Sequence, residues 1–187
     1  MLLVAIMIVC GCNAPSATIC ESCIEAKRHH QWCEACDVGY VAGVPIPSRL
    51  LFETLDAHGH DLDLASITCP TCKAAIEADG FCAACGIGWC HKQAYFSRLT
   101  YWLAQGERRD TAGLTCNTCR RSAMKTGWCD ACGLGWVGNT AFRNRSAFDA
   151  AQPEYDRLSA ALKTLDRCEH CAVALWTDTT CFDCTTQ

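Results

Sequence analysis

The chain has 187 residues, of which 19 are cysteine, and a formal net charge of −4 at pH 7. Cysteine at this level marks a disulfide scaffold or a metal-rich chain, and a mildly acidic chain has no general attraction to nucleic acid. Large aliphatic residues are sparse between the cysteines. A unit of roughly 35 to 50 residues therefore buries too little apolar surface to fold without a cross-link.

The N-terminus begins with an apolar run from Leu2 to Val9. A membrane-spanning helix needs about 20 residues, whereas this shorter run is typical of the apolar region of a secretory signal. Val9-Cys10-Gly11-Cys12 resembles the lipobox of bacterial lipoproteins, which implies lipidation of Cys12. We therefore expect a signal segment over residues 1–12, a tether over residues 13–19 and a lipid-anchored protein of the cell envelope. Because no Lys or Arg precedes the run, a buried N-terminal strand or helix turn in a cytoplasmic protein is the alternative.

Sixteen cysteines form four copies of the pattern C-x2-C-x9-C-x2-C, which begin at residues 20, 69, 116 and 168. The sets are Cys20/Cys23/Cys33/Cys36, Cys69/Cys72/Cys82/Cys85, Cys116/Cys119/Cys129/Cys132 and Cys168/Cys171/Cys181/Cys184. The first three copies continue with aligned residues: Gly39, Gly88 and Gly135, then Tyr40, Trp89 and Trp136, then Arg49, Arg98 and Arg145, then Phe52, Tyr101 and Phe148. Such repeats define an array of units. We expect units over residues 20–68, 69–115, 116–167 and 168–187, the last of them truncated.

Within each set, the nine-residue spacer predicts a β-hairpin, whose turn in the second unit is Ala78-Asp79-Gly80. Between the sets, helices are expected over residues 49–56, 94–105 and 141–151, because apolar residues recur there at helical spacing. Their ends are marked by Gly59, Gly106 and Pro153. An additional amphipathic helix is expected after Pro153, with one side formed by Tyr155, Leu158, Ala161, Leu162 and Leu165.

The spacing of the cysteines carries the chemistry. Two residues between paired cysteines let a tight turn aim both sulfur atoms at one point, so two pairs supply four thiolates at the corners of a tetrahedron. This is the donor set of a closed structural zinc site, which contributes on the order of 10 kcal/mol to folding. We therefore predict four Zn²⁺ ions, one for each set, with all sixteen cysteines as ligands. Two alternatives stay open: disulfides or redox-active thiols, which an exported chain would favour, and iron bound by the same sulfurs.

Each set resembles a short zinc ribbon of the kind found in double zinc-ribbon proteins. The resemblance rests on the CxxC pairs, their separation, an aromatic residue before the third cysteine and a glycine after the fourth. Trp32, Phe81 and Trp128 supply the aromatic residue, and Gly86 and Gly133 supply a glycine that would let a backbone N–H turn toward sulfur. Thr180, Asp37 and Thr185 depart from the pattern. The resemblance implies a small metal-stabilised α+β fold of four tandem ribbons joined by short α-helices, but no single function.

The remaining polar residues are interpreted as structural. Each repeated arginine precedes an aromatic residue by three positions, so we expect it to cover an aromatic ring of its unit, namely Tyr40, Trp89 or Trp136. A repeated contact with an anion is the alternative. We expect Cys90 to be a buried apolar residue. The cluster of His58, His60, Asp61 and Asp63 is interpreted as a solvated loop rather than a weak divalent-metal site.

The sequence shows no recognisable Ser-His-Asp set, phosphate-binding loop or pair of acidic residues at an active site, and closed metal sites disfavour metal catalysis. We expect a non-enzymatic zinc-binding protein that acts as a scaffold or protein-interaction module. Two alternatives stay open. One is a thiol–disulfide or metal-handling protein of the cell envelope. The other is nucleic-acid binding through the basic third unit, which carries Arg120, Arg121, Lys125, Arg143 and Arg145.

Overall fold

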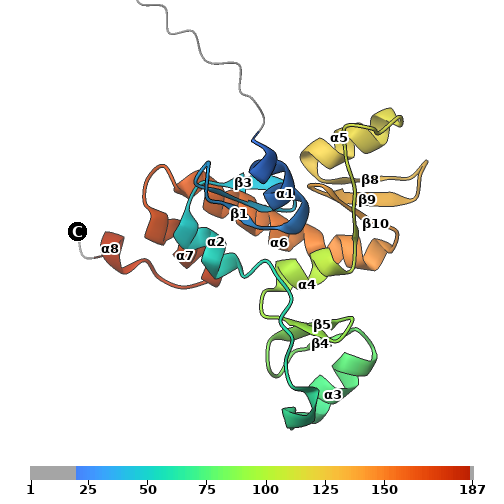
Figure 1. Cartoon of the computed structure of the whole chain (residues 1–187), viewed down its shortest axis with the longest axis vertical. Coiled ribbons are helices and arrows are strands. Elements are labelled where there is room, and N and C mark those ends of the chain that lie inside the picture. The colour runs from blue at the N-terminus through green and yellow to red at the C-terminus, as the bar shows by residue number, and fades with distance from the viewer. Residues whose placement is uncertain (1–19, 186–187) are drawn as a thin grey trace, which may run out of the picture.

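The structure is a computed structural model that describes residues 20–185. The signal segment and tether expected over residues 1–19, including Cys12, lie outside the described residues. The described part is a small α+β fold with three small antiparallel sheets and helices (Figure 1). Within residues 20–185, no helix is both long and apolar enough to cross a membrane.

The first three units share one order of elements: a helix, three antiparallel strands and a second helix. In the first unit they are α1 (Glu21–His29), β1 (Trp32–Cys33), β2 (Val38–Val41), β3 (Val44–Ile46) and α2 (Arg49–Leu55). In the second unit they are α3 (Pro70–Glu77), β4 (Phe81–Cys82), β5 (Ile87–Cys90), β6 (Gln93–Tyr95) and α4 (Arg98–Ala104). In the third unit they are α5 (Asn117–Lys125), β8 (Gly127–Cys129), β9 (Leu134–Val137), β10 (Thr140–Phe142) and α6 (Arg145–Thr164). Two short elements lie in the linkers, η1 (Leu64–Ser66) and β7 (Glu107–Arg108).

The hairpin predicted for the nine-residue spacer is wrong, because a helix begins within the first CxxC pair of every set and fills most of the spacer. The spacer of the second unit begins Lys73-Ala-Ala-Ile-Glu, and these are mostly strong helix formers. The hairpin lies one cysteine pair later: β4 pairs with β5 so that Cys82 faces Ile87, and the second CxxC pair forms the turn. Each complete unit therefore brings together the start of a helix and the turn of a hairpin.

The helices predicted after the sheets are present as α2, α4 and α6, but several of their boundaries differ, and α6 begins at Arg145 because Ala141 and Phe142 belong to β10. Ala94 and Tyr95 belong to β6, because they complete the sheet by pairing with β5. Pro153 does not end a helix but lies inside the 20-residue helix α6. A proline in a helix interior costs about 3 kcal/mol. Burial of Leu158 and Ala161, both with no exposed surface, offsets part of that cost by keeping the second half packed in the core.

A close approach explains the repeated glycine of the second strand in each sheet. A Cβ atom on Gly88 would lie 2.2 Å from Cγ of Tyr101, which belongs to the following helix. Gly39 and Gly135 stand in the same relation to Phe52 and Phe148. Without a side chain at this position, the aromatic ring of the second helix packs directly on the strand backbone.

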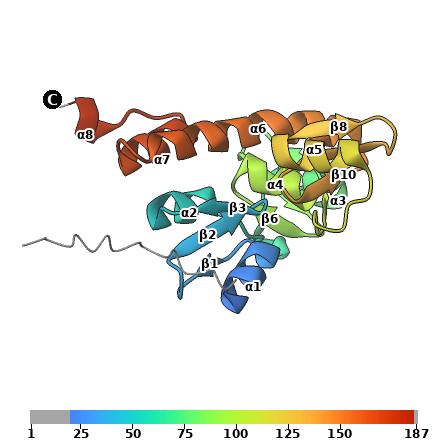
Figure 2. The same ribbon diagram turned by 90° about the horizontal axis from the view of Figure 1, so that it is seen from above.

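One apolar core joins the units. It combines residues of the first, third and fourth units with two leucines of α4, Leu99 and Leu103. The long helix α6 contacts both α4 and α7 (Glu169–Thr177), and α7 also contacts α2. Figure 2 shows α6 and α7 running together along one side of the molecule, and Figure 1 shows α3 with the β4–β5 hairpin projecting below α4. The array is therefore folded back on α6 rather than extended.

The first and third units contact each other through two turns, the one between β2 and β3 and the one between β9 and β10. The amide of Asn139 donates to the carbonyl oxygen of Ala42 at 2.9 Å. A Cβ atom on Gly138 would lie 2.0 Å from that same oxygen, and Gly138 has a φ of 55°. Glycine is therefore required at this contact both by space and by backbone conformation. Strand β7 adds to the edge of the third sheet by pairing with β10, which ties the linker after α4 to the third unit.

The fourth unit lacks the sheet. Its described residues form α7 and α8 (Phe182–Thr185), and no strand is assigned within residues 168–185. Trp176 and Ala172 of α7 are buried in the shared core. The last unit is therefore a helix docked on its neighbours, and not the truncated ribbon with a hairpin that the sequence predicted.

Candidate metal centres

All four predicted cysteine sets come together in the structure. In each set, the four Sγ atoms lie within 4.8 Å of one another. The sulfur atoms of the first and third cysteines are 3.9 Å apart in the first, second and fourth sets and 3.8 Å apart in the third. Zn–S bonds of about 2.3 Å place the corners of a tetrahedral site about 3.8 Å apart. These spacings fit one tetrahedral metal ion for each set.

The same distances do not fit disulfide bonds, which require sulfur atoms about 2.05 Å apart. Even Cys171 and Cys184 of the fourth set, whose sulfur atoms are 3.2 Å apart, are too far from each other for a disulfide. Four groups of four cysteines with tetrahedral spacing are therefore compatible with zinc-binding repeats, zinc being the typical metal for this donor set.

Helix starts stabilise one thiolate in each of the first three sets. The first cysteine of each of these sets is the residue directly before the helix, where the positive end of the helix dipole favours a thiolate. The N–H of Cys23 lowers the pKa of Cys20 to about 7, and that of Cys72 lowers the pKa of Cys69 to about 7. The N–H of Cys119 lowers the pKa of Cys116 to about 6. Metal ligation requires the thiolate, so this placement favours metal binding.

In the first three sets, an aromatic N–H or O–H group on the second strand lies beside the second cysteine. The indole nitrogens of Trp89 and Trp136 are buried without a conventional hydrogen-bond partner. Burial raises the pKa of Cys72 to about 12, and the indole of Trp89 opposes this shift. Burial likewise raises the pKa of Cys119, and Trp136 opposes it. An indole N–H without another acceptor interacts most favourably with a neighbouring sulfur when that sulfur is a thiolate, which is the form that binds a metal.

In the first unit, Tyr40 takes the place of tryptophan. Its hydroxyl donates a hydrogen bond to the sulfur of Cys23, and this contact raises the pKa of Tyr40 to about 12. Tyrosine and tryptophan share a donor at the end of a flat ring, so the alignment of Tyr40 with Trp89 and Trp136 preserves that donor. The sequence identified these residues as repeated aromatics, but their direction toward sulfur appears only in the structure.

The turn after the fourth cysteine adopts a left-handed backbone conformation. The φ values of Asp37, Gly86 and Gly133 are 51°, 70° and 60°. The N–H of Gly86 donates to the carbonyl oxygen of Cys82 at 2.8 Å, which is a backbone acceptor and not the sulfur that the sequence predicted. The glycine is thus explained by the turn, and Asp37 takes the same conformation, which aspartate tolerates better than most residues.

The opposite face of each sheet carries the repeated arginines. The guanidinium carbon lies 5.2 Å from the ring centre of Trp32 for Arg49 and 4.9 Å from that of Trp128 for Arg145. In the second unit, Arg98 lies 5.0 Å from the ring centre of Phe81. The arginines therefore cover aromatic rings as predicted, but the rings are those before the third cysteine. The predicted rings face the metal side, because alternate residues of a strand point to opposite faces.

The fourth set differs in its surroundings. Cys184 is exposed and the other three cysteines are half-buried, whereas the third cysteine of each earlier set is buried. Cys168 precedes α7 and its sulfur accepts from the N–H of Cys171 at 3.4 Å. An exposed ion pair between His170 and Asp183 joins the two halves of the set. This set therefore lacks the sheet and the aromatic donor that surround the first three.

Two other predicted features are placed by the structure. Cys90 is buried, with 2 % of its surface exposed, and burial raises the pKa of its thiol to about 11. In the linker after α2, His58 and His60 gather around Asp56, and not around the predicted Asp61 and Asp63. The missed residue is Asp56, and the D-x-H-x-H spacing is the sequence signal that points to it.

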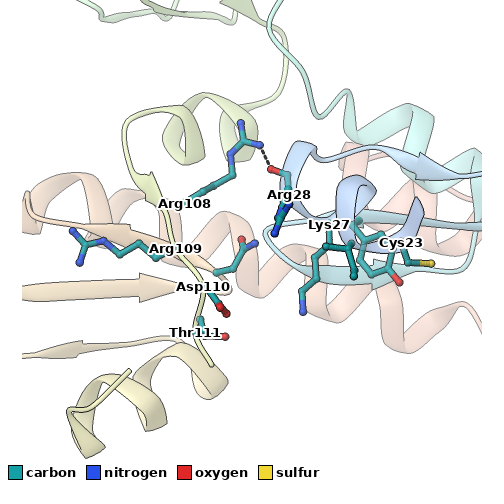
Figure 3. Close-up of a pocket in the computed structure, with 10 residues that line it drawn as sticks. Cys23, Lys27, Arg28, Arg108, Arg109, Asp110 and Thr111 are labelled. Atoms are coloured by element: carbon teal, nitrogen blue, oxygen red, sulfur yellow. Dashed lines mark hydrogen bonds between the residues drawn. The ribbon is translucent and has the colours of Figure 1, made fainter. Parts of the chain in front are cut away.

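A cavity of about 690 Å³ lies between α1 and the segment that follows β7. Figure 3 shows Lys27 and Arg28 on one side of it and the segment from Arg108 to Thr111 on the other. Its charged lining consists of four cations and one carboxylate: Lys27, Arg28, Arg108, Arg109 and Asp110. Arg28 pairs with Glu25 and Arg109 pairs with Glu107, whereas Arg108 donates to the backbone carbonyl of Arg28. The charges of Lys27 and Arg108 are thus left without a carboxylate contact among the described ion pairs.

The cations of the basic third unit have different surroundings. Arg145 pairs with Asp149 and lies over Trp128, and Arg120 donates to Asn117 of its own helix. The remaining cations, Arg121, Lys125 and Arg143, are exposed or half-buried. The cavity beside α1 is lined by cations of the first unit and of the linker after β7, and by none from the third unit.

Comparison with known proteins gives no relative: no family model, no curated protein and no solved structure matches the chain. The class of protein therefore rests on the fold and the sites. They define a small α+β chain with four cysteine groups that are compatible with metal-binding repeats.

Proposed function

We propose that this chain is a non-enzymatic structural zinc-binding repeat protein, with one Zn²⁺ in each four-cysteine set, that acts as a scaffold for a protein partner. The observation that carries the proposal is the convergence of four sulfurs within 4.8 Å of one another in every set. Four thiolates fill a tetrahedral coordination sphere, so such a site holds structure and leaves no position for a substrate.

In this proposal, the cysteines of each set hold two segments of the chain together through the metal ion. In the second unit, Cys69 and Cys72 fix the start of α3, and Cys82 and Cys85 fix the turn of the β4–β5 hairpin. The local core around them is small, with Ala75, Trp89 and Ala94 as its buried members besides cysteine. Zinc supplies a cross-link on the order of 10 kcal/mol, which exceeds what these few side chains contribute by burial.

The test is the metal content of natively purified protein, with Cys82→Ser and Cys90→Ser as a matched pair. Both cysteines are buried, but only Cys82 belongs to a set. After a wash with a weak chelator, we expect four zinc ions in the wild type and in Cys90→Ser, and three in Cys82→Ser. Thiol labelling should be blocked until a strong chelator is added. Metal-free protein with oxidised CxxC pairs would instead establish the thiol–disulfide alternative, and iron in place of zinc would correct the metal.

For the partner, we propose an acidic protein segment that binds the basic cavity beside α1. Its lining concentrates positive charge on a chain whose net charge is −4, which gives charge complementarity to carboxylates. A glutamate-rich peptide is the probe. Binding that weakens with salt and is lost in Lys27→Glu, but not in Arg121→Glu on α5, supports the cavity. Binding of single-stranded nucleic acid that is lost in Arg121→Glu would establish nucleic-acid binding through the third unit instead.

Anchoring of this scaffold to the cell envelope through Cys12 is part of the proposal and rests on the lipobox-like sequence alone. A lipid-modified Cys12 has a mass and a detergent requirement that the Cys12→Ser variant lacks. Mass spectrometry of the protein from its native cells checks this, and an unmodified, unprocessed N-terminus would favour the cytoplasmic alternative.

A further inference from the structure

Three potential metal ligands gather in the loop between α2 and η1. Nε2 of His60 lies 2.9 Å and 3.0 Å from the two carboxylate oxygens of Asp56. Nδ1 of His58 lies 3.5 Å from one of the same oxygens. One donor atom from each residue lies within 4.8 Å of the other two, and the two imidazole rings are 4.3 Å apart at their centres.

The backbone holds this loop at both ends. Asp56 ends α2 in a left-handed conformation with a φ of 47°, and its N–H donates to the carbonyl oxygen of Glu53. At the other end, His60 and Ala94 exchange two backbone hydrogen bonds of 2.8 Å and 2.9 Å. The ring of His60 also packs on Phe96, with 4.8 Å between ring centres. Backbone hydrogen bonds therefore hold both ends of the loop that carries the three side chains.

We propose that Asp56, His58 and His60 bind a fifth metal ion, a divalent first-row transition metal such as Zn²⁺ or Ni²⁺. Ligand bonds of about 2.1 Å place neighbouring donors about 3.0 Å apart in an octahedral site and about 3.4 Å apart in a tetrahedral one. The separations of 2.9 Å for His60 and 3.5 Å for His58 from Asp56 are close to these two values. Imidazole nitrogen with one carboxylate oxygen is a donor set that suits zinc, nickel and copper. The site does not depend on the cysteine sets or on the proposed scaffold role.

This site differs chemically from the four cysteine sets. Three protein ligands leave at least one coordination position open to water or to another ligand. The side chain of His58 is 67 % exposed and that of Asp56 is 23 % exposed, so the open position faces solvent. Bound metal would join the end of α2 in the first unit to the edge of β6 in the second, because His60 is paired with Ala94. The fifth ion is thus exchangeable where the other four are enclosed by sulfur.

The experiment is calorimetric titration of the untagged, zinc-loaded chain with Ni²⁺, which prefers imidazole to water and leaves the thiolate sites loaded. We expect one equivalent to bind to the wild type, and no binding in His58→Ala/His60→Ala. Asp56→Asn keeps the shape of the side chain but removes its charge, and it should weaken binding at least tenfold. His29→Ala is the matched control: His29 is also an exposed histidine beside a carboxylate, that of Glu25, but the neighbouring imidazole, that of His30, is buried. The His29→Ala variant should bind one equivalent of Ni²⁺, as the wild type does.

A second measurement locates the ion. Ni²⁺ is paramagnetic, so it should broaden the NMR signals of the His60 and Phe96 rings at one equivalent, before those of His29 or His91. Equal stoichiometry in the wild type and the double variant, or loss of binding in His29→Ala, would overturn the site and leave a plain carboxylate–histidine ion pair. Sulfur-bound zinc is counted in the same samples by thiol labelling. A wrong zinc count would refute the scaffold proposal without changing the nickel result.

Discussion

Replacing Trp136 with phenylalanine separates the contact of the indole N–H with the sulfur of Cys119 from the packing of the ring. Trp136 has no exposed surface, and its N–H finds no conventional partner but acts on the thiol of Cys119. Removing a group that bonds to a metal ligand typically weakens metal binding about 10- to 100-fold. That range corresponds to about 1.4 to 2.8 kcal/mol of binding free energy. On the proposed function, we therefore expect one of the four proposed zinc ions to become easier to remove.

The third unit offers an internal control for this change. Trp128 lies on the other face of the same sheet, against Phe148 and below Arg145. Trp128→Phe removes the same atoms but leaves the surroundings of the cysteine sulfurs unchanged. Zinc release is followed by competition with a chromophoric chelator. In Trp136→Phe, one equivalent should leave at about 10- to 100-fold lower chelator concentration, whereas Trp128→Phe should release all four as the wild type does. Early release of one equivalent in both variants, or in neither, would refute a role for the indole N–H.

The other predictions concern the packing and charge of the same framework. Gly135→Ala should destabilise the protein by about 1 to 3 kcal/mol, because its Cβ would lie 2.5 Å from the ring of Phe148, whereas Gly113→Ala, with no atom within 4 Å, should be near neutral in thermal unfolding. Burial, and secondarily Arg108, lowers the pKa of His30 to about 4. The unfolded chain therefore takes up the extra proton first, and stability that is full above pH 6.5 should fall toward pH 4 by up to about 1.4 kcal/mol per pH unit. In His30→Gln that part of the slope should be absent from denaturant titrations, and an unchanged slope would contradict the assignment. Arg145→Lys, which loses the flat stack on Trp128 at 4.9 Å, should cost about 0.5 to 1 kcal/mol of unfolding free energy, and a loss no larger than that of exposed Arg121→Lys would refute the stacking contribution.

The cysteine sets were predictable because the spacing of the cysteines over a short stretch of chain is enough to define each set. Two residues between cysteines and nine between the pairs suffice to define four donors, and the structure gathers all sixteen sulfurs as the spacing indicated. The repeated Gly88 and Tyr101 are also visible in the sequence. Their close packing, which would leave only 2.2 Å between a Cβ atom on Gly88 and the ring of Tyr101, follows from a helix folding back onto its own sheet. The hairpin expected for the spacer is wrong because CxxC pairs suggest two hairpin turns, while Lys73 to Glu77 favour a helix that begins at the first pair.

The sequence by itself determined the donor sets of this protein: four groups of four cysteines in repeated units, with an aromatic residue and an arginine at fixed places in the first three. The tertiary structure decided which face each of these residues occupies, so that Trp89 and Trp136 face sulfur while Arg98 and Arg145 cover the other side. It also decided that α6 continues through Pro153 and that Asp56 meets His58 and His60. The physical reason is that ligand spacing is fixed by covalent geometry over a few bonds, whereas strand facing, helix continuation and loop closure depend on burial against residues far away in the chain.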